Sequence, residues 1–200
     1  RRGPSTGDWR GQLISTGRLG IRRFSPDDVR GLHEYLSDAK VVPYEPYGVF
    51  SDEQSRQEAI IRSGDKAFWA VCLKDSAKLI GNLFLSEGQF ATWELGYVFN
   101  SRYQGPGYAT ESARAILAHA FETLGARRVV ALCNPENERS WRLLERLGMR
   151  REGHLKQNIY FKTDQNGAPL WSDTYEYALL ASEWKPGEAG RALGEPPDAL

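Results

Sequence analysis

The chain has 200 residues, and its 26 lysines and arginines balance 26 aspartates and glutamates, which gives a formal net charge of zero at pH 7. A balanced charge provides no overall field that would draw the chain to nucleic acid or to an anionic membrane, and no apolar run approaches the roughly twenty residues of a membrane span. Cys72 and Cys133 are too few for a disulfide framework and belong to no Cys/His cluster, so we expect no metal site. These features favour a cytoplasmic protein.

Composition predicts one domain with a tail at either end. Residues 1–11 mix Gly, Pro, Ser, Thr and charge, and residues 186–200 are rich in Pro, Gly, Ala and acid, which is typical of segments that bury little apolar surface. Residues 12–185 have an ordinary apolar content and suit a single core.

The first half of the domain predicts a strand, two helices and three further strands. Ser25, followed by proline and two aspartates, is a helix start, and Ser51 with Gln54 forms a capping box for a second helix. A loop over residues 38–50 separates these helices. In chain order, the predicted elements are a strand at 18–24, helices at 26–37 and 51–64, and strands at 68–74, 79–86 and 90–99.

The second half predicts two helices and three strands. Gly125 and Gly148 each follow an apolar helical pattern and are expected to end a helix. A turn at residues 164–167 joins the two strands of a long terminal hairpin. The predicted elements are a helix at 107–124, a strand at 129–133, a helix at 137–147 and strands at 149–161 and 174–180.

The most informative segment is residues 103–111, where a turn containing Gly105 and Gly107 leads directly into a helix. The first amides of a helix have no acceptor within it and lie at the positive end of the peptide dipoles, so a phosphate bound there satisfies both. Taken alone, such a turn can equally be an ordinary junction between two elements. Its surroundings decide between these readings.

Two motifs give the chain a resemblance to a known superfamily. Residues 104–109 (Gln-Gly-Pro-Gly-Tyr-Ala) match the cofactor motif of the Gcn5-related N-acetyltransferases, and residues 137–149 resemble the family's next segment, an asparagine that opens a helix ending in Leu-Gly-Met. The motifs come in the family's order. Residues 93–97 (Trp-Glu-Leu-Gly-Tyr), 171–177 and 183–184 look most like the branch that acetylates ribosomal-protein N-termini.

The resemblance covers roughly residues 11–184 and implies both a fold and a reaction. The implied fold is α/β, with a central mixed but mostly antiparallel sheet of about seven strands, helices on both faces, and a fourth strand that parts from the fifth. The implied reaction is acetyl transfer from acetyl-CoA to a primary amine, by direct attack in a ternary complex.

In the family, amides of the glycine-rich turn bind the pyrophosphate of the cofactor, and the splayed strand binds its pantetheine arm. Pro106 is a departure, because it has no N–H and removes one potential donor. Asn137 matches a family asparagine that bonds the cofactor arm, although a helix N-cap is the alternative. The residues implied to bind acetyl-CoA are Tyr97, Val98, Phe99, Gln104, Gly105, Gly107, Tyr108, Ala109, Thr110 and Asn137.

The catalytic candidates are Glu94 and Ser140. A primary amine is protonated at neutral pH, so a base must accept its proton, and Glu94 lies on the strand that leads to the pantetheine slot. Its alternative is a strand glutamate paired with an arginine. The resemblance to the ribosomal-protein branch implies that Ser140, three residues after the matched asparagine, is the acid for the leaving thiolate; its alternative is a solvating residue of the first helical turn. Leu132 and Leu144 occupy positions where other relatives carry an acid or a tyrosine.

Specificity is expected in the 38–50 loop and the terminal hairpin, which border the acceptor cleft in this fold. Aromatic rims with acids suit a cationic amine, and a protein or peptide N-terminus is the favoured acceptor. The expected substrate-binding residues are Tyr44, Glu45, Tyr47, Trp171 and Asp173.

Several alternatives stay open at this point. The acceptor can instead be a small amine such as an antibiotic, polyamine or amino acid, or the chain can be a catalytically weak acyl-CoA-binding regulatory module. In each case we expect a monomer or homodimer with no nucleic-acid or membrane partner. A covalent acetyl-enzyme on Cys133 is disfavoured, because no histidine stands near it in sequence. A Rossmann site is disfavoured as well, since residues 105–107 lack the third glycine at the required offset.

Overall fold

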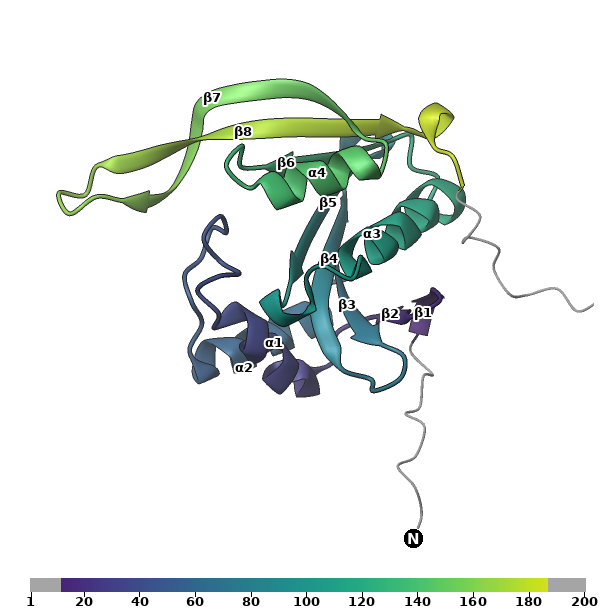
Figure 1. Ribbon diagram of the computed structural model, residues 1–200, viewed down its shortest axis with the longest axis horizontal. Helices are drawn as coiled ribbons and strands as arrows, with labels where there is room; N and C mark the ends of the chain where they lie inside the picture. The colour runs from purple at the N-terminus through teal and green to yellow at the C-terminus, as the bar shows by residue number, and fades with distance from the viewer. Residues whose placement is uncertain (1–11, 187–200) are drawn as a thin grey trace, which may run out of the picture.

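The structure, a computed structural model, describes residues 12–186, so the predicted tail at 1–11 and nearly all of the tail at 186–200 lie outside the described residues. The main elements, in chain order, are β1 (Gln12–Ser15), β2 (Leu19–Arg22), α1 (Val29–Leu36), α2 (Asp52–Gly64), β3 (Phe68–Leu73), β4 (Leu79–Glu87), β5 (Thr92–Phe99), α3 (Tyr108–Ala118), β6 (Arg128–Cys133), α4 (Glu138–Arg146), β7 (Arg150–Thr163) and β8 (Pro169–Leu180). This order confirms the predicted α/β fold (Figure 1).

The strands form a single sheet in the order β1-β2-β3-β4-β5-β6-β8-β7. All neighbouring pairs are antiparallel except β5 and β6, which are parallel. The described chain has one strand more than the expected number, because Gln12–Ser15 pairs with β2 at the edge of the sheet. Four residues with no sustained alternation are too short a signal to predict that strand from sequence.

The predicted splay lies between β5 and β6. Residues of β5 pair with β6 only at Thr92, Trp93 and Glu94, whereas they pair with β4 along the whole strand as far as Phe99. Past Glu94 the two strands therefore diverge and divide the sheet into two parts, with the opening between them visible in Figure 1.

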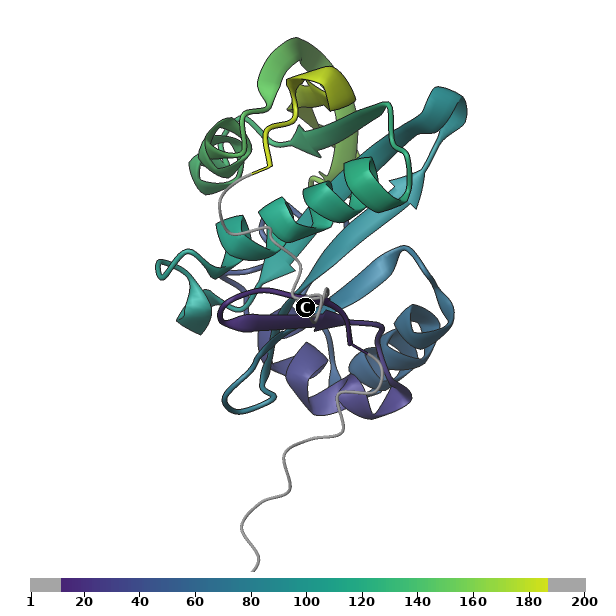
Figure 2. The ribbon, with the colours of Figure 1, turned by 90° about the vertical axis from the view of Figure 1, so that its right-hand side faces the viewer.

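Helices cover both faces of the sheet. Successive side chains of a strand point to opposite faces, and both faces of the central strands carry apolar side chains. In β3, Trp69 and Val71 belong to the core under α3, while Ala70 and Cys72 pack with α1 and α2 on the opposite face. Figure 2 shows α3 running across one face of the sheet, with α1 and α2 on the other side. The larger core also includes the apolar residues of α4. Packing of α3 and α4 in this core therefore fixes the N-termini of both helices beside the gap between β5 and β6.

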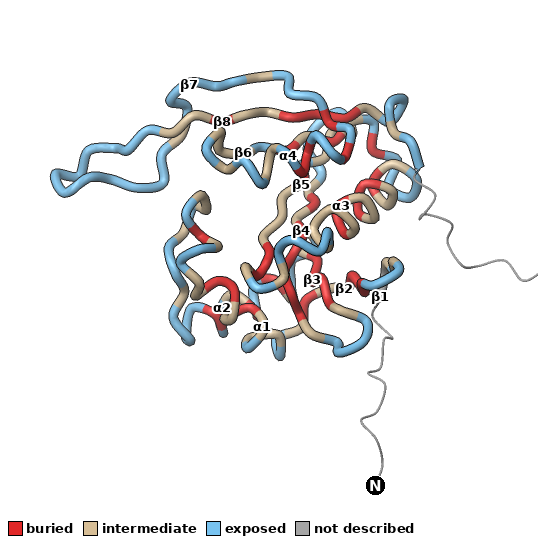
Figure 3. Tube along the Cα trace, viewed as in Figure 1, coloured by how far each residue is buried: buried red, intermediate tan, exposed pale blue. Residues whose placement is uncertain are grey.

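Local signals placed the helix boundaries well. Capping boxes at Ser25 and Ser51 are both present, and Gly125 and Gly148 adopt positive φ angles of 68° and 84° after helices. The helix predicted at 107–124 differs in one respect, because its last part, His119–Thr123, is a π-helix. Beyond the sheet, the distal half of the β7–β8 hairpin extends outward and is exposed (Figure 3).

Candidate active site

A cleft of about 1530 Å³ opens where β5 parts from β6. Its walls are formed by β5, the turn before α3, the start of α4, the 38–50 loop and the inner part of the terminal hairpin. All of the predicted site residues except Trp171 line this cleft. The splay of the sheet therefore brings together side chains that are far apart in the sequence.

The glycine-rich turn at one end of the cleft has the backbone geometry that its sequence predicts. Gly105 and Gly107 have φ angles of 110° and 86°, in the left-handed region that favours glycine, and Gly107 is the N-cap of α3. The first bond of the helix runs from the amide of Glu111 to the carbonyl of Gly107, at 3.0 Å. The amides of residues 108–110 therefore have no helical acceptor and are available to an anion.

Gln104 closes this turn against two other elements. Its Nε2 donates to the carbonyl of Phe99 at the end of β5, at 3.2 Å, and its Oε1 accepts a hydrogen bond from Nη1 of Arg139 on α4, at 2.6 Å. Sequence analysis missed Arg139, although it lies within the second motif, directly before Ser140. This guanidinium places a positive charge beside the turn.

The edge of β5 that faces the cleft has no strand partner beyond Glu94 within the described chain. Residues 97–99 are paired to β4 on their other side, which holds their backbone rigid. An extended chain with its own amide groups can therefore add along this edge as a further strand does. This is the place expected for a pantetheine arm.

Asn137 is used as a helix cap, the alternative that the sequence left open. Its Oδ1 accepts a hydrogen bond from the amide of Ser140 at 3.3 Å, and it is the N-cap residue of α4. One acceptor site of the side-chain oxygen is therefore used by the cap, and the amide nitrogen of Asn137 stays available to a ligand.

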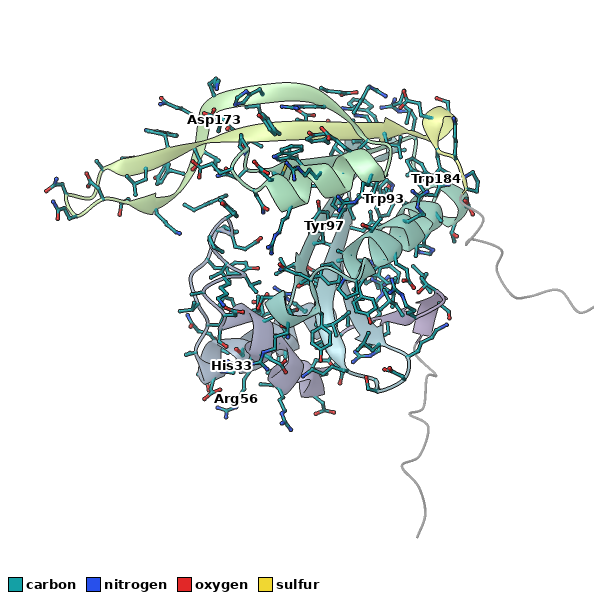
Figure 4. All side chains as sticks on the ribbon, viewed as in Figure 1. His33, Arg56, Trp93, Tyr97, Asp173 and Trp184 are labelled. Atoms are coloured by element: carbon teal, nitrogen blue, oxygen red, sulfur yellow. The ribbon has the colours of Figure 1, made fainter. Side chains whose placement is uncertain are left out.

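Tyr97, labelled in Figure 4, is hydrogen-bonded to Ser140, and both residues line the cleft. The Tyr97 hydroxyl donates to the Ser140 carbonyl at 3.0 Å, and the two hydroxyl oxygens are also 3.0 Å apart. Burial raises the pKa of Tyr97 above its ordinary value, so this phenol is neutral at physiological pH. Sequence analysis assigned only the backbone of Tyr97 and missed this hydroxyl, because a contact between residues 43 positions apart leaves no local signal.

Glu94 is exposed and lies at the point where β5 leaves β6. Within residues 12–186, no hydrogen bond or ion pair engages its carboxylate, so the arginine-paired alternative is not what the structure contains. The carboxylate is therefore free to accept a proton from a group in the cleft.

Cys133, at the end of β6, also lines the cleft. Burial raises the pKa of this thiol to about 11, despite a hydrogen bond with Ser140 that acts in the opposite direction. A neutral thiol is a poor nucleophile, so these surroundings argue against a covalent acetyl-enzyme.

One end of the cleft is lined by the 38–50 loop. The Tyr44 hydroxyl donates to the carbonyl of Glu136 at 3.3 Å, which connects this loop to the segment before α4. Glu45 and Tyr47 also line the cleft, and burial raises the pKa of both side chains. An acid and two phenols thus meet at this end.

The hairpin residues behave differently from one another. Asp173 accepts hydrogen bonds from Nζ of Lys156 at 2.9 Å, from the amide of Gln157 at 2.9 Å and from Nε2 of His154 at 2.7 Å, and these hold its pKa far below the usual range. Its carboxylate is therefore already engaged by β7. Trp171 packs edge-on against Tyr160, with ring centroids 5.2 Å apart, outside the cleft-lining set.

Two kinds of feature are absent from the described residues. No helix of residues 12–186 is long and apolar enough to cross a membrane. Over the same residues, no group of three or more His, Cys, Asp or Glu side chains is arranged to hold a metal ion.

Comparison with known proteins gives consistent matches over most of the chain. The acetyltransferase (GNAT) domain family matches residues 18–150. The uncharacterized N-acetyltransferase YnaD of Bacillus subtilis is 40% identical, over 86% of this chain and 98% of its own length. A crystal structure of a GNAT-family acetyltransferase from Bacillus anthracis superposes with a TM-score of 0.78 at 38% identity, covering 85% of this chain and 99% of that one.

Two more distant relatives have named acceptors. The [ribosomal protein uS5]-alanine N-acetyltransferase of Escherichia coli is 28% identical, over 87% of this chain and 93% of its own length. The spermidine N(1)-acetyltransferase of the same species is 23% identical, over 84% of this chain and 91% of its own. Relatives of this chain therefore include enzymes for a protein N-terminus and for a polyamine.

Proposed function

The chain belongs to the GNAT family of N-acetyltransferases, and from this premise we propose that it transfers the acetyl group of acetyl-CoA to the N-terminal amine of a protein or peptide. The observation that carries the proposal is one continuous cleft, with an anion-binding turn at one end, an open strand edge along its wall, and the free carboxylate of Glu94 beside that edge.

The residues present fit a CoA group. The free amides of residues 108–110 and the open backbone at Gly105 and Gly107 suit a pyrophosphate, and Arg139 adds a positive charge beside them. The β5 edge at residues 97–99 suits the amides of a pantetheine arm. When bound there, acetyl-CoA supplies an acetyl group activated as a thioester, which a neutral amine attacks directly.

Two residues of the chain then accept and donate protons during the reaction. Glu94 accepts the proton of the incoming ammonium, directly or through one water, because the residue is exposed, lines the cleft and has no other partner among the described residues. Ser140, whose hydroxyl lies 3.0 Å from the neutral phenol of Tyr97, passes its proton to the leaving sulfur and regains the second proton that the amine nitrogen loses as it becomes an amide. Neither role requires Cys133 to ionise.

The acceptor end supports an extended cationic substrate. Tyr44, Glu45 and Tyr47 supply aromatic faces and a carboxyl group that suit an ammonium, and the cleft continues between the 38–50 loop and the hairpin. The relative that acetylates an alanine of ribosomal protein uS5 favours a protein N-terminus. A small polyamine is the second candidate, because a more distant relative acetylates spermidine and the same acidic rim suits a free polyamine.

The direct test is titration calorimetry with acetyl-CoA, followed by an assay of thiol release. Acceptors should include peptides that begin with Ala, Ser or Thr, their N-terminally blocked forms, and small amines including spermidine. Thiol release that requires a free peptide N-terminus supports the proposal, and release with spermidine alone supports the second candidate. Binding of acetyl-CoA with no turnover on any acceptor contradicts the assignment of an active enzyme.

The Glu94→Gln variant tests the proposed base. We expect kcat to fall by about 10² to 10⁴, the range typical of a lost general base, while the Kd for acetyl-CoA stays at its wild-type value. The matched control is Glu87→Gln, an exposed glutamate on the neighbouring strand β4 outside the main cleft. A wild-type rate for Glu94→Gln rules out the assigned role.

The Ser140→Ala variant tests the proposed acid. We expect a smaller fall in kcat, of about 10² or less, because thiolate is a good leaving group. The loss should grow when the acceptor is used at high pH, where other proton donors are scarce. An unchanged kcat across the pH range would leave Ser140 with only its structural contacts.

A further inference from the structure

We propose that Arg18, which lies directly before β2, is a positioning residue that holds the phosphate-binding turn in its binding conformation. The inference rests on the proposed function, because it takes the turn before α3 as the pyrophosphate site. Arg18 is not among the residues that line the cleft, so it acts on a ligand only through the turn.

Arg18 contacts the turn and the helix at three points. Its Nη1 donates to the carbonyl of Pro106 at 3.0 Å, and its guanidinium lies over the ring of Tyr108, 4.5 Å from the centroid. Its Nε donates to Oε2 of Glu111 at 2.7 Å, and Nη2 lies 2.6 Å from the same oxygen. One side chain thus grips both the middle of the turn and the first turn of α3.

The bond to Pro106 determines the direction of an amide that faces the other way. A trans peptide is planar, so the carbonyl of Pro106 and the N–H of Gly107 point to opposite sides of the same unit. Arg18 lies outside the cleft and Gly107 lines it, so holding the carbonyl outward aims the amide toward the cleft. On one side of this peptide, Gly107 has no side chain to restrict its rotation, so the contact with Arg18 adds a restraint from outside the turn.

The ion pair with Glu111 serves the same site. Glu111 is a carboxylate in the first turn of α3, where it would repel a bound phosphate. Burial alone would raise its pKa, but hydrogen bonds from Thr16 and from the backbone and side chain of Arg18 lower the pKa below its ordinary value. The carboxylate is therefore ionised and needs the guanidinium of Arg18 to neutralise it.

The test separates the phosphate-binding end of the cofactor from its acyl end. For Arg18→Met we expect the calorimetric Kd for CoA to rise by about tenfold or more, the effect of one lost charge-assisted contact. The kcat/KM with acetyl-pantetheine, which lacks the pyrophosphate and nucleotide, should stay at its wild-type value. Arg18→Lys keeps the charge but loses the planar guanidinium that bonds Pro106 and Glu111 together, so it should recover only part of the CoA affinity.

The matched control is Arg30→Met, which removes an exposed arginine away from the cleft. Glu111→Gln added to Arg18→Met removes the carboxylate that Arg18 no longer neutralises, and it should recover part of the CoA affinity. Wild-type CoA affinity in Arg18→Met overturns the inference, as does an equal loss with CoA and acetyl-pantetheine, which would indicate general disruption. Failure of the wild-type protein to bind CoA would instead contradict the proposed function itself.

Discussion

The hydroxyl groups of Tyr97 and Ser140 form a hydrogen-bonded pair, and the Ser140 carbonyl determines which hydroxyl donates and which accepts. A carbonyl oxygen only accepts, so the Tyr97 proton is directed to the Ser140 carbonyl, and the Ser140 hydroxyl then donates to the Tyr97 oxygen, 3.0 Å away. The pair therefore holds the Ser140 side chain in one rotamer, with its proton directed at the Tyr97 oxygen. The role proposed for Ser140 requires this proton to turn from Tyr97 to the leaving sulfur.

Tyr97→Phe should separate this positioning from packing. The change keeps the ring and removes only the hydroxyl, so we expect about 1 kcal/mol of lost stability and a lower kcat with little change in the Kd for acetyl-CoA. Urea unfolding and steady-state kinetics measure the two effects. Tyr160→Phe, on the exposed hairpin, is the control and should be neutral in both. A kcat equal to wild type would show that the hydroxyl only stabilises the fold.

The raised pKa of Cys133 gives a second prediction at a single residue. With a pKa of about 11, the thiol is neutral at pH 7 to 8, so iodoacetamide should modify it slowly and increasingly fast as the pH rises. Cys133→Ala should retain most of the acetyl transfer. Intact mass spectrometry after incubation with acetyl-CoA should detect no acetyl adduct on wild type, and a stable adduct lost in Cys133→Ala would reinstate the covalent route.

At the scale of elements, the β4–β5 pair depends on a glycine that admits an aromatic ring. A Cβ at Gly81 would lie 2.6 Å from both the Phe99 ring and the carbonyl of Val98, closer than such atoms approach. Phe99 is 6% exposed and belongs to the main core, so neither group can move away easily. Gly81 therefore lets β5 lie close to β4 just where its other edge opens to the cleft.

Gly81→Ala should destabilise the protein by about 1 to 3 kcal/mol, the usual result of overpacking a filled core. Gly96→Ala, one strand away, is the control, because a Cβ there would meet Phe84 at an ordinary 3.4 Å. Urea unfolding of the two variants compares them directly. Equal stability of Gly81→Ala and wild type would mean that β4 and β5 shift apart at little cost.

Elements with local signals were predictable, and those that depend on partners were not. The capping boxes at Ser25 and Ser51 and the glycine after α3 fix their helix ends by contacts within a few residues. The strand Gln12–Ser15 exists only because it pairs with β2. The π-helical end of α3 at residues 119–123 likewise follows no composition rule that a sequence displays.

In the whole molecule, the site was likewise predictable where it depends on consecutive residues and not where it depends on contacts between distant ones. The motifs located the turn at residues 104–109 and the start of α4, because the chemistry of an anion-binding turn is written in consecutive residues. The contacts that orient these motifs come from distant residues, Arg18 on the turn and Tyr97 on Ser140, and leave no pattern in sequence. Asp173 lines the cleft as predicted, but its carboxylate is already hydrogen-bonded to residues of β7, which the sequence does not reveal.

Although the net charge of the molecule is zero, the pKa shifts of its acids are nearly all in one direction. Most of the acids with shifted pKa values are held below their ordinary values by hydrogen bonds and nearby cations, whereas burial raises the pKa of Glu45. The acids with lowered pKa values are Glu34, Asp38, Glu111, Glu152, Asp173 and Glu183. The unfolded chain therefore binds protons more tightly at these sites than the folded protein does.

Acid should consequently unfold the protein. A depressed pKa contributes stability that is complete above the unfolded value of about 4 and is lost as the pH falls through the folded value, so the urea midpoint should drop between about pH 5 and 3. Glu45 has the opposite sign, and its single contribution should only reduce the slope. Asp173→Asn removes one depressed group and should flatten the profile, with Asp75→Asn, an exposed acid bonded only to Ser76, as its control. A midpoint that holds constant or rises toward pH 3 would mean that these ion pairs do not persist in solution.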